Sequence, residues 1–211
     1  MTYLLSNPDR ILLLLGQHIL LTFGSLSLAF IIALPLGWLL YRHKRWAPPV
    51  LGVLGILYTI PSIALIIFLI PIFGLNDRSV IVALVVYCQV ILVRNVIAGL
   101  ESIDPAILEA ARGMGMNTMQ IAWRVQLPLA LPVILAGLRI AAVVSVAIAT
   151  LGAKFGSGGL GSLLFEGIAQ AGRVDKIWLG AILVALLAFT INRIILSLER
   201  HFTPQLQLEK A

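Results

Sequence analysis

The sequence predicts an all-α protein that crosses a membrane several times. Of its 211 residues, 60% are hydrophobic and only 11% are charged, and the mean hydropathy is +1.05. A water-soluble domain carries about 25% charged and about 45–50% apolar residues. The apolar residues also form long uncharged runs. The strands of a membrane barrel would instead alternate apolar and polar residues over segments of about ten residues. These observations exclude a soluble enzyme, a disordered tail and a nucleic-acid-binding domain.

The uncharged runs predict five transmembrane helices, because a spanning helix needs about 20 mostly apolar residues. Asn7-Pro8-Asp9 is typical of a helix start, so we expect residues 9–16 to form a short helix on the membrane surface before the first span. Residues 1–211 are expected to form one membrane domain. Its predicted spans cover residues 17–41, 49–73, 79–99, 129–152 and 177–198.

The basic residues predict the orientation, because cytoplasmic loops collect Lys and Arg. Nine of the 15 Lys and Arg residues fall on one side of the predicted spans, and the densest group is Arg42-His43-Lys44-Arg45. This places the N-terminus outside and the C-terminus in the cytoplasm. The nine are Arg42, Lys44, Arg45, Arg94, Arg112, Arg124, Arg193, Arg200 and Lys210.

The loop over residues 101–128 is too long for a simple connection and is expected to have its own structure. Asp104 and Pro105 are typical of a helix start, which predicts a short helix over Pro105–Arg112. Gly113 and Gly115 permit a sharp exit, Asn117–Val125 is expected to form a second short helix, and Pro128 is expected to open the next span. One apolar stripe at helical spacing, suited to docking in a groove, comprises Ile107, Leu108, Ala111 and Met114.

This loop resembles the EAA motif of ABC importer permeases. Glu109-Ala110-Ala111 is followed after three residues by Gly115, and after nine more by Val125-Gln126-Leu127-Pro128, where the family pattern has Ile in place of Val125. The segments Thr59–Leu65 and Gly158–Gly161 look like those of osmoprotectant permeases, which take glycine betaine, carnitine or choline. Methionine importer permeases are similar in size and architecture, so an amino acid such as methionine is the alternative substrate.

The resemblance implies the small type I ABC importer fold with five transmembrane helices, as in methionine permeases, in a bacterial-type plasma membrane. It implies a transport subunit rather than an enzyme, with ATP and Mg bound by partner ATPase subunits and no cofactor on this chain. The other implied partners are a second permease copy or a paralogous permease, an extracytoplasmic substrate-binding protein and the lipid membrane, with no nucleic acid.

In such permeases the motif forms a coupling helix in a cleft of the ATPase, which implies that role for residues 105–118. The alternative is an amphipathic helix resting on lipid. The residues that the resemblance assigns to coupling are Glu109, Ala110, Ala111, Arg112, Gly115, Leu127 and Pro128.

Three further segments are candidates for the translocation pathway or a gate. Arg139 lies within a predicted span, where it either lines the pathway or pairs with a carboxylate or helix carbonyls. Gly158, Gly159 and Gly161 belong to a literal G-x-G-x-x-G, but no strand precedes it, so a nucleotide site is not predicted. We expect Leu160–Ile168 to form a short helix that acts as a gate or contacts a binding protein. The alternative is a plain loop. Pro61 and Ser62 interrupt the second span.

Two other classes of protein fit the sequence less well. A secondary transporter usually has inverted repeats and several deep ionisable residues, and only Arg139 is deep here. An intramembrane enzyme needs converging polar groups, and the three histidines, His18, His43 and His201, are too far apart in sequence to suggest a metal site. The chain has no Walker A motif, so we expect no ATP hydrolysis by this chain.

Overall fold

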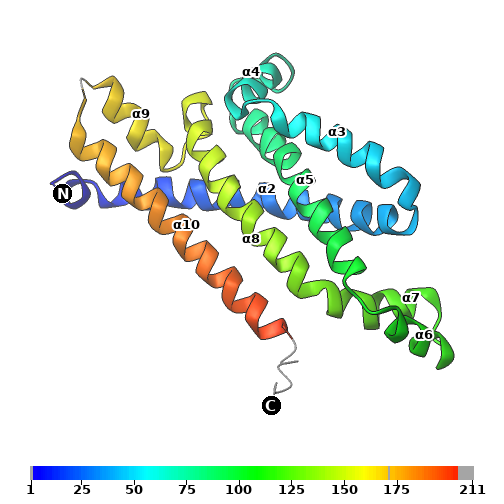
Figure 1. Cartoon of the computed structure of the whole chain (residues 1–211). Helices are drawn as coiled ribbons and strands as arrows, with labels where there is room; N and C mark the ends of the chain where they lie inside the picture. The colour runs from blue at the N-terminus through cyan, green and yellow to red at the C-terminus, as the bar shows by residue number, and fades with distance from the viewer. Residues whose placement is uncertain (1, 171, 204–211) are drawn as a thin grey trace.

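The computed structural model describes residues 2–170 and 172–203, and these residues contain helices and no strand, which confirms the all-α prediction. Four helices are long and apolar enough to cross a membrane, and a bent helix pair provides a fifth crossing if it acts as one span. Figure 1 shows them as a tilted bundle. The four long helices are α2 (Pro8–Arg42), α5 (Asp77–Glu101), α8 (Leu127–Gly152) and α10 (Val174–Phe202).

Helix α2 is continuous from Pro8, so the separate surface helix expected over residues 9–16 is wrong. Those residues are the first turns of α2, and two of them, Ile11 and Leu14, are buried. With 35 residues the helix is about 52 Å long, more than the roughly 30 Å of hydrocarbon in a bilayer, so it must tilt or project beyond it. The short α1 (Thr2–Ser6) precedes it.

The second predicted span, residues 49–73, is not one straight helix. It consists of α3 (Ala47–Thr59) and α4 (Ser62–Phe73), which are bent by 96°. The physical reason is Pro61, which forces the preceding residue away from the helical region. Ile60 accordingly has φ −65° and ψ 128°, and α3 ends one residue before it.

The core lies where α2, α5 and α8 meet. Small residues on α2 allow the approach: Ala29 and Ala33 are fully buried, and a Cβ at Gly37 would lie 2.6 Å from Cβ of Val96 on α5. In contrast, α3 has no buried residue. The bundle of this single chain therefore leaves much of its apolar surface free for lipid or another subunit.

The short helices lie at opposite ends of the bundle in Figure 1. At one end are the turn Lys44–Trp46 and helices α6 (Pro105–Gly113) and α7 (Thr118–Ile121). At the other end are α1, the turn Ala153–Phe155 and α9 (Gly161–Ala169). Lys210, counted in the orientation prediction, lies outside the described residues.

The second short helix expected over Asn117–Val125 is also corrected. Helix α7 covers Thr118–Ile121 and passes through a π-helical segment, Ala122–Gln126, directly into α8. Pro128 lacks an N–H, and its ring would clash with the carbonyl of Arg124 in a regular α-helix. The wider π turn accommodates it, and Pro128 lies in the first turn of α8 as expected, although the helical stretch reaches it from α7 without a break.

Candidate functional site

Helix α6 carries the Glu-Ala-Ala part of the motif at the end of the bundle. Its start is capped, because the Asp104 carboxylate accepts a hydrogen bond from the backbone N–H of Ala106 at 2.9 Å. Glu109 and Arg112 are exposed, and neither has an ion pair or hydrogen bond from its side chain to another described residue. Two opposite charges are thus presented to the surroundings on a short, capped helix.

The apolar stripe of this helix is divided between two directions, which corrects the expectation that all of it docks in a partner's groove. Ala111 is 2% exposed and Leu108 packs against the buried cluster that contains Ile103. Ile107 and Met114 are exposed, at 44% and 75%. One half of the stripe therefore holds α6 on its own bundle, and the outer half, with exposed Ala110, remains available to a partner.

Gly115 and the start of α7 form the turn between the two short helices. Gly115 has φ +78°, a left-handed conformation that favours glycine. Asn117 and Gln120 then form a capping box, with reciprocal side-chain to backbone hydrogen bonds of 2.8 and 2.9 Å. The last two motif residues follow: Leu127 packs against the Ile103 cluster, and Pro128 is exposed.

The glycine segment lies at the opposite end of the bundle, against the first third of α2. Gly158 and Gly159 have φ +69° and +83°. The backbone N–H of Gly159 donates to Gln17 Oε1 at 3.0 Å, and a Cβ on Gly159 would lie 3.0 Å from His18 Nδ1. Gly161 begins α9 so close to α8 that a Cβ there would lie 2.1 Å from the carbonyl oxygen of Thr150.

Gln17 and His18 were missed by the sequence analysis, although they hold this turn. His18 is fully buried. Their signal is that they form a polar pair within the otherwise apolar run from Ile11 to Leu21. Only the fold reveals that Gly159, 142 residues after Gln17, packs on them.

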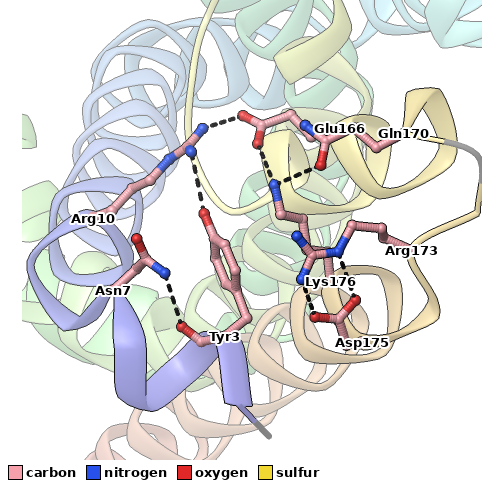
Figure 2. A network of polar contacts seen from close by, with 8 residues as sticks. All are labelled: Tyr3, Asn7, Arg10, Glu166, Gln170, Arg173, Asp175 and Lys176. Atoms are coloured by element: carbon pink, nitrogen blue, oxygen red, sulfur yellow. Dashed lines mark hydrogen bonds and ion pairs between the residues drawn. The ribbon is translucent and has the colours of Figure 1, made fainter.

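Helix α9 is held at this same end by a network of charged and polar side chains, also missed by the sequence analysis (Figure 2). Glu166 on α9 accepts from Arg10 of α2 and from Lys176 Nζ of α10 at 3.4 Å. Lys176 also donates to Gln170 at 3.0 Å and lies 4.7 Å from the Tyr3 ring centre, and it is only 4% exposed. The network joins α1, α2, α9 and α10.

Pro61 and Ser62 form the corner between α3 and α4. Pro61 is exposed, Ser62 is half-buried, and the Pro61 carbonyl accepts from the N–H of Leu65 at 3.0 Å. Three residues of α4, Leu65, Ile66 and Leu69, are buried against α5. The corner is therefore a joint between one exposed helix, α3, and one anchored helix, α4.

Arg139 pairs with Glu199 of α10, with Nε to Oε2 at 3.1 Å. Glu199 is thus a carboxylate partner of the kind expected if Arg139 has a structural role rather than lining the pathway. From Arg139 to the end of α8 at Gly152 is about 20 Å of helix, and the glycine turn lies beyond it. The structure therefore does not join the candidate pathway residues into one site: Arg139, the Pro61 corner and the glycine turn occupy three separate positions.

No group of three or more His, Cys, Asp or Glu side chains that could hold a metal ion occurs among the residues the structure describes.

Comparisons with known proteins agree with this arrangement. Residues 25–207 match the family described as binding-protein-dependent transport system inner membrane component. The osmoprotectant import permease protein OsmW of Salmonella typhimurium is 38% identical over 208 residues, covering 96% of each chain. The carnitine transport permease protein OpuCB of Listeria monocytogenes is 36% identical over 204 residues, covering 97% of this chain and 93% of the relative.

A solved structure has the same fold. The MetNI methionine ABC transporter in an inward-facing conformation contains a chain that superimposes with a TM-score of 0.83 and is 26% identical. The match covers 92% of this chain and 96% of that one. The prediction of a methionine-permease-like, type I importer fold is confirmed.

Proposed function

Because this chain belongs to the family of binding-protein-dependent transport system inner membrane components, we propose that it forms the translocation pathway for an osmoprotectant such as glycine betaine, carnitine or choline. The chain is a multi-pass permease subunit of an ATP-binding-cassette importer. The substrate class is supported by the names of relatives that match nearly its whole length.

The observation that carries the mechanism is the free outer face of α6. Glu109, Ala110 and Arg112 are exposed, whereas Ala111 anchors the helix on its own bundle. We propose that this face, with Gly115 at its exit, sits in a cleft of the ATPase subunit. ATP and Mg bind on that partner, and the closing of an ATPase pair moves two such helices toward each other.

The rigid connection from α6 to the bundle supports this role. Leu108 and Leu127 pack in the same cluster, and α7 continues through the π segment into α8 without an interruption. A displacement of α6 is therefore passed to a helix that crosses the membrane. The end with α6 and Arg42–Arg45 is cytoplasmic in this proposal, and the end with α9 meets the substrate-binding protein.

A second permease subunit is needed to enclose a pathway, and the exposed surfaces of α3 and α4 support one. Val53 and Ile56 on α3 and Ile67 and Phe68 on α4 are 51–72% exposed. The 96° corner at Pro61 sets the two exposed helices almost at right angles to each other. We place the second copy, or a paralogous permease, on this side.

Methionine is the alternative cargo, favoured by the fold of the MetNI permease. Identity there is 26%, compared with 36–38% for relatives named for osmoprotectants, so the osmoprotectant proposal has more support. A single experiment separates them. The permease, its ATPase and its binding protein are reconstituted in vesicles, and ATP-dependent uptake of labelled glycine betaine, carnitine, choline and methionine is measured.

We expect uptake of at least one of the first three and none of methionine. Uptake of methionine alone would replace the substrate proposal and keep the importer. Uptake without the ATPase would overturn the importer mechanism itself, in favour of a secondary transporter.

A further inference from the structure

The structure contains an apolar groove whose lining includes the motif residue Leu127. It has a volume of 340 Å³ and lies between α2, α5 and the stretch that joins α7 to α8. Trp38 of α2 and Trp123 of the π segment line it, together with Leu34, Leu100 and Met119. All three stretches that form it belong to candidate membrane spans, so membrane lipid can reach it.

The groove has a basic end. Leu34, Trp38 and Arg42 follow one another at intervals of four residues and therefore lie on one face of α2. The Arg42 guanidinium lies 5.1 Å from the centre of the Trp38 ring, where it is held by a cation–π contact. Among the described residues Arg42 has no ion pair with a carboxylate, whereas Lys44, two residues later, pairs with Glu101 at 3.6 Å.

We propose that this groove binds an acyl chain of an anionic phospholipid, whose phosphate is held by Arg42. The apolar walls match the chain, and Arg42, with Arg45 close in sequence, matches the charge of the headgroup. Interfacial tryptophans are common membrane anchors. Here, however, the two indoles line one hollow between packed helices, and Trp123 is fixed there by its hydrogen bond to Met119 Sδ at 3.0 Å.

A second copy of this chain is a poorer occupant on electrostatic grounds. The chain carries a formal net charge of +6, and the cations Lys44, Arg112 and Arg124 at this end stand beside the carboxylates of Glu101, Asp104 and Glu109. A second copy would bring more positive charge to Arg42. A lipid phosphate brings the opposite charge.

The site has a consequence for the segment from α6 to the start of α8, which carries the motif. Met119 and Trp123 belong to the stretch between α6 and α8, so a bound chain packs between this stretch and α2. The lipid would stabilise the position of the segment relative to the bundle, whatever substrate the importer carries. The proposal therefore stands apart from the identity of the cargo.

Quenching of tryptophan fluorescence by brominated lipids tests the site directly. The full chain has four tryptophans, and Trp46→Phe with Trp178→Phe leaves only the two that line the groove. This variant is reconstituted in phosphatidylcholine vesicles with a small, equal fraction of brominated phosphatidylglycerol or brominated phosphatidylcholine. We expect stronger quenching by the anionic lipid, and about fivefold weaker relative binding of that lipid after Arg42→Gln.

Arg193→Gln is the matched control, because Arg193 also lies over an aromatic ring, Phe189 at 5.9 Å, on a membrane helix. It should leave the excess quenching unchanged. Filling the groove by Ala122→Leu should remove the excess quenching while Arg42 is intact. In native mass spectrometry, the unmodified chain should retain phosphatidylglycerol in preference to phosphatidylcholine. Equal quenching by both lipids, or an excess that survives Arg42→Gln, would overturn the proposal. Loss of quenching as permease dimers form would assign the groove to a second copy.

Discussion

Arg139 on α8 and Glu199 on α10 form an ion pair that connects two membrane helices, with Nε and Oε2 3.1 Å apart. Both side chains are mostly shielded, at 29% and 21% exposed. The positive charge in the fourth predicted span is thus neutralised by a carboxylate near the end of α10, the fifth predicted span. An apolar surrounding makes each of these two charges costly without the other.

Removing one member of this pair should destabilise the permease. We expect Arg139→Gln or Glu199→Gln to lower the free energy of unfolding by about 1–3 kcal/mol, because the remaining charge loses its partner. Unfolding in mixed micelles measures this. The exchange Arg139→Glu with Glu199→Arg should recover much of the loss, and normal stability and uptake in both single variants would show that the pair has neither a structural nor a transport role.

A methyl group at Gly159 should destabilise the protein more than a methyl group at Gly172, which has a similar backbone conformation. Gly159 and Gly172 have φ +83° and +73°, but only at Gly159 would a Cβ meet buried His18, at 3.0 Å. Both alanine variants carry left-handed strain, and Gly159→Ala should cost about 1–3 kcal/mol more through overpacking. Thermal unfolding of the two variants side by side decides this. Equal losses would mean that the loop simply moves away from α2.

Glu109→Arg should uncouple the importer without unfolding the permease. Glu109 is exposed and has no described partner within the chain, so stability should not change. In the proposed ATPase cleft the reversed charge should repel, and uptake should fall at least tenfold, a loss of about 1.4 kcal/mol in coupling. Uptake and ATP hydrolysis are measured together in vesicles.

The control for that variant is Glu101→Arg, the same charge reversal at the same end of the bundle. Glu101 is exposed and forms only a surface ion pair with Lys44, so its loss should have a small effect. Unchanged uptake in Glu109→Arg would remove this residue from the coupling site.

Lys176 should matter more than the neighbouring Arg173. Lys176 is 4% exposed and contacts Glu166, Gln170 and the ring of Tyr3, whereas Arg173 pairs with Asp175 at the surface. We expect Lys176→Met to cost about 1–3 kcal/mol and Arg173→Gln to have little effect. A double-mutant cycle of Lys176→Met with Glu166→Gln should give a coupling energy of about 0.5–3 kcal/mol. Additive effects would show that the contact between Lys176 and Glu166 does not stabilise the position of α9.

Much of the fold was predictable because membrane helices leave a strong local signal. The apolar runs predicted five crossings. The observed α5 extends two residues beyond the predicted residues 79–99 at each end, and α8 begins two residues before the predicted residues 129–152 and ends where predicted. The Asp104-Pro105 start of α6 and the Gly115 turn were predictable for the same reason, since capping and left-handed turns depend on a few neighbouring residues. The corner at Pro61 was visible as a proline, but its 96° angle depends on packing against α5.

The sequence by itself determined that this chain is helical, that it crosses a membrane, and that it carries a coupling motif between its third and fourth spans. These properties follow from hydropathy and from residues adjacent in the chain. The tertiary structure alone decided that Glu199 neutralises Arg139, that Gln17 and His18 hold the glycine turn, and that half of the α6 stripe faces inward. Each of these joins residues on different helices or selects one face of a helix, and such choices depend on the packing of the whole bundle.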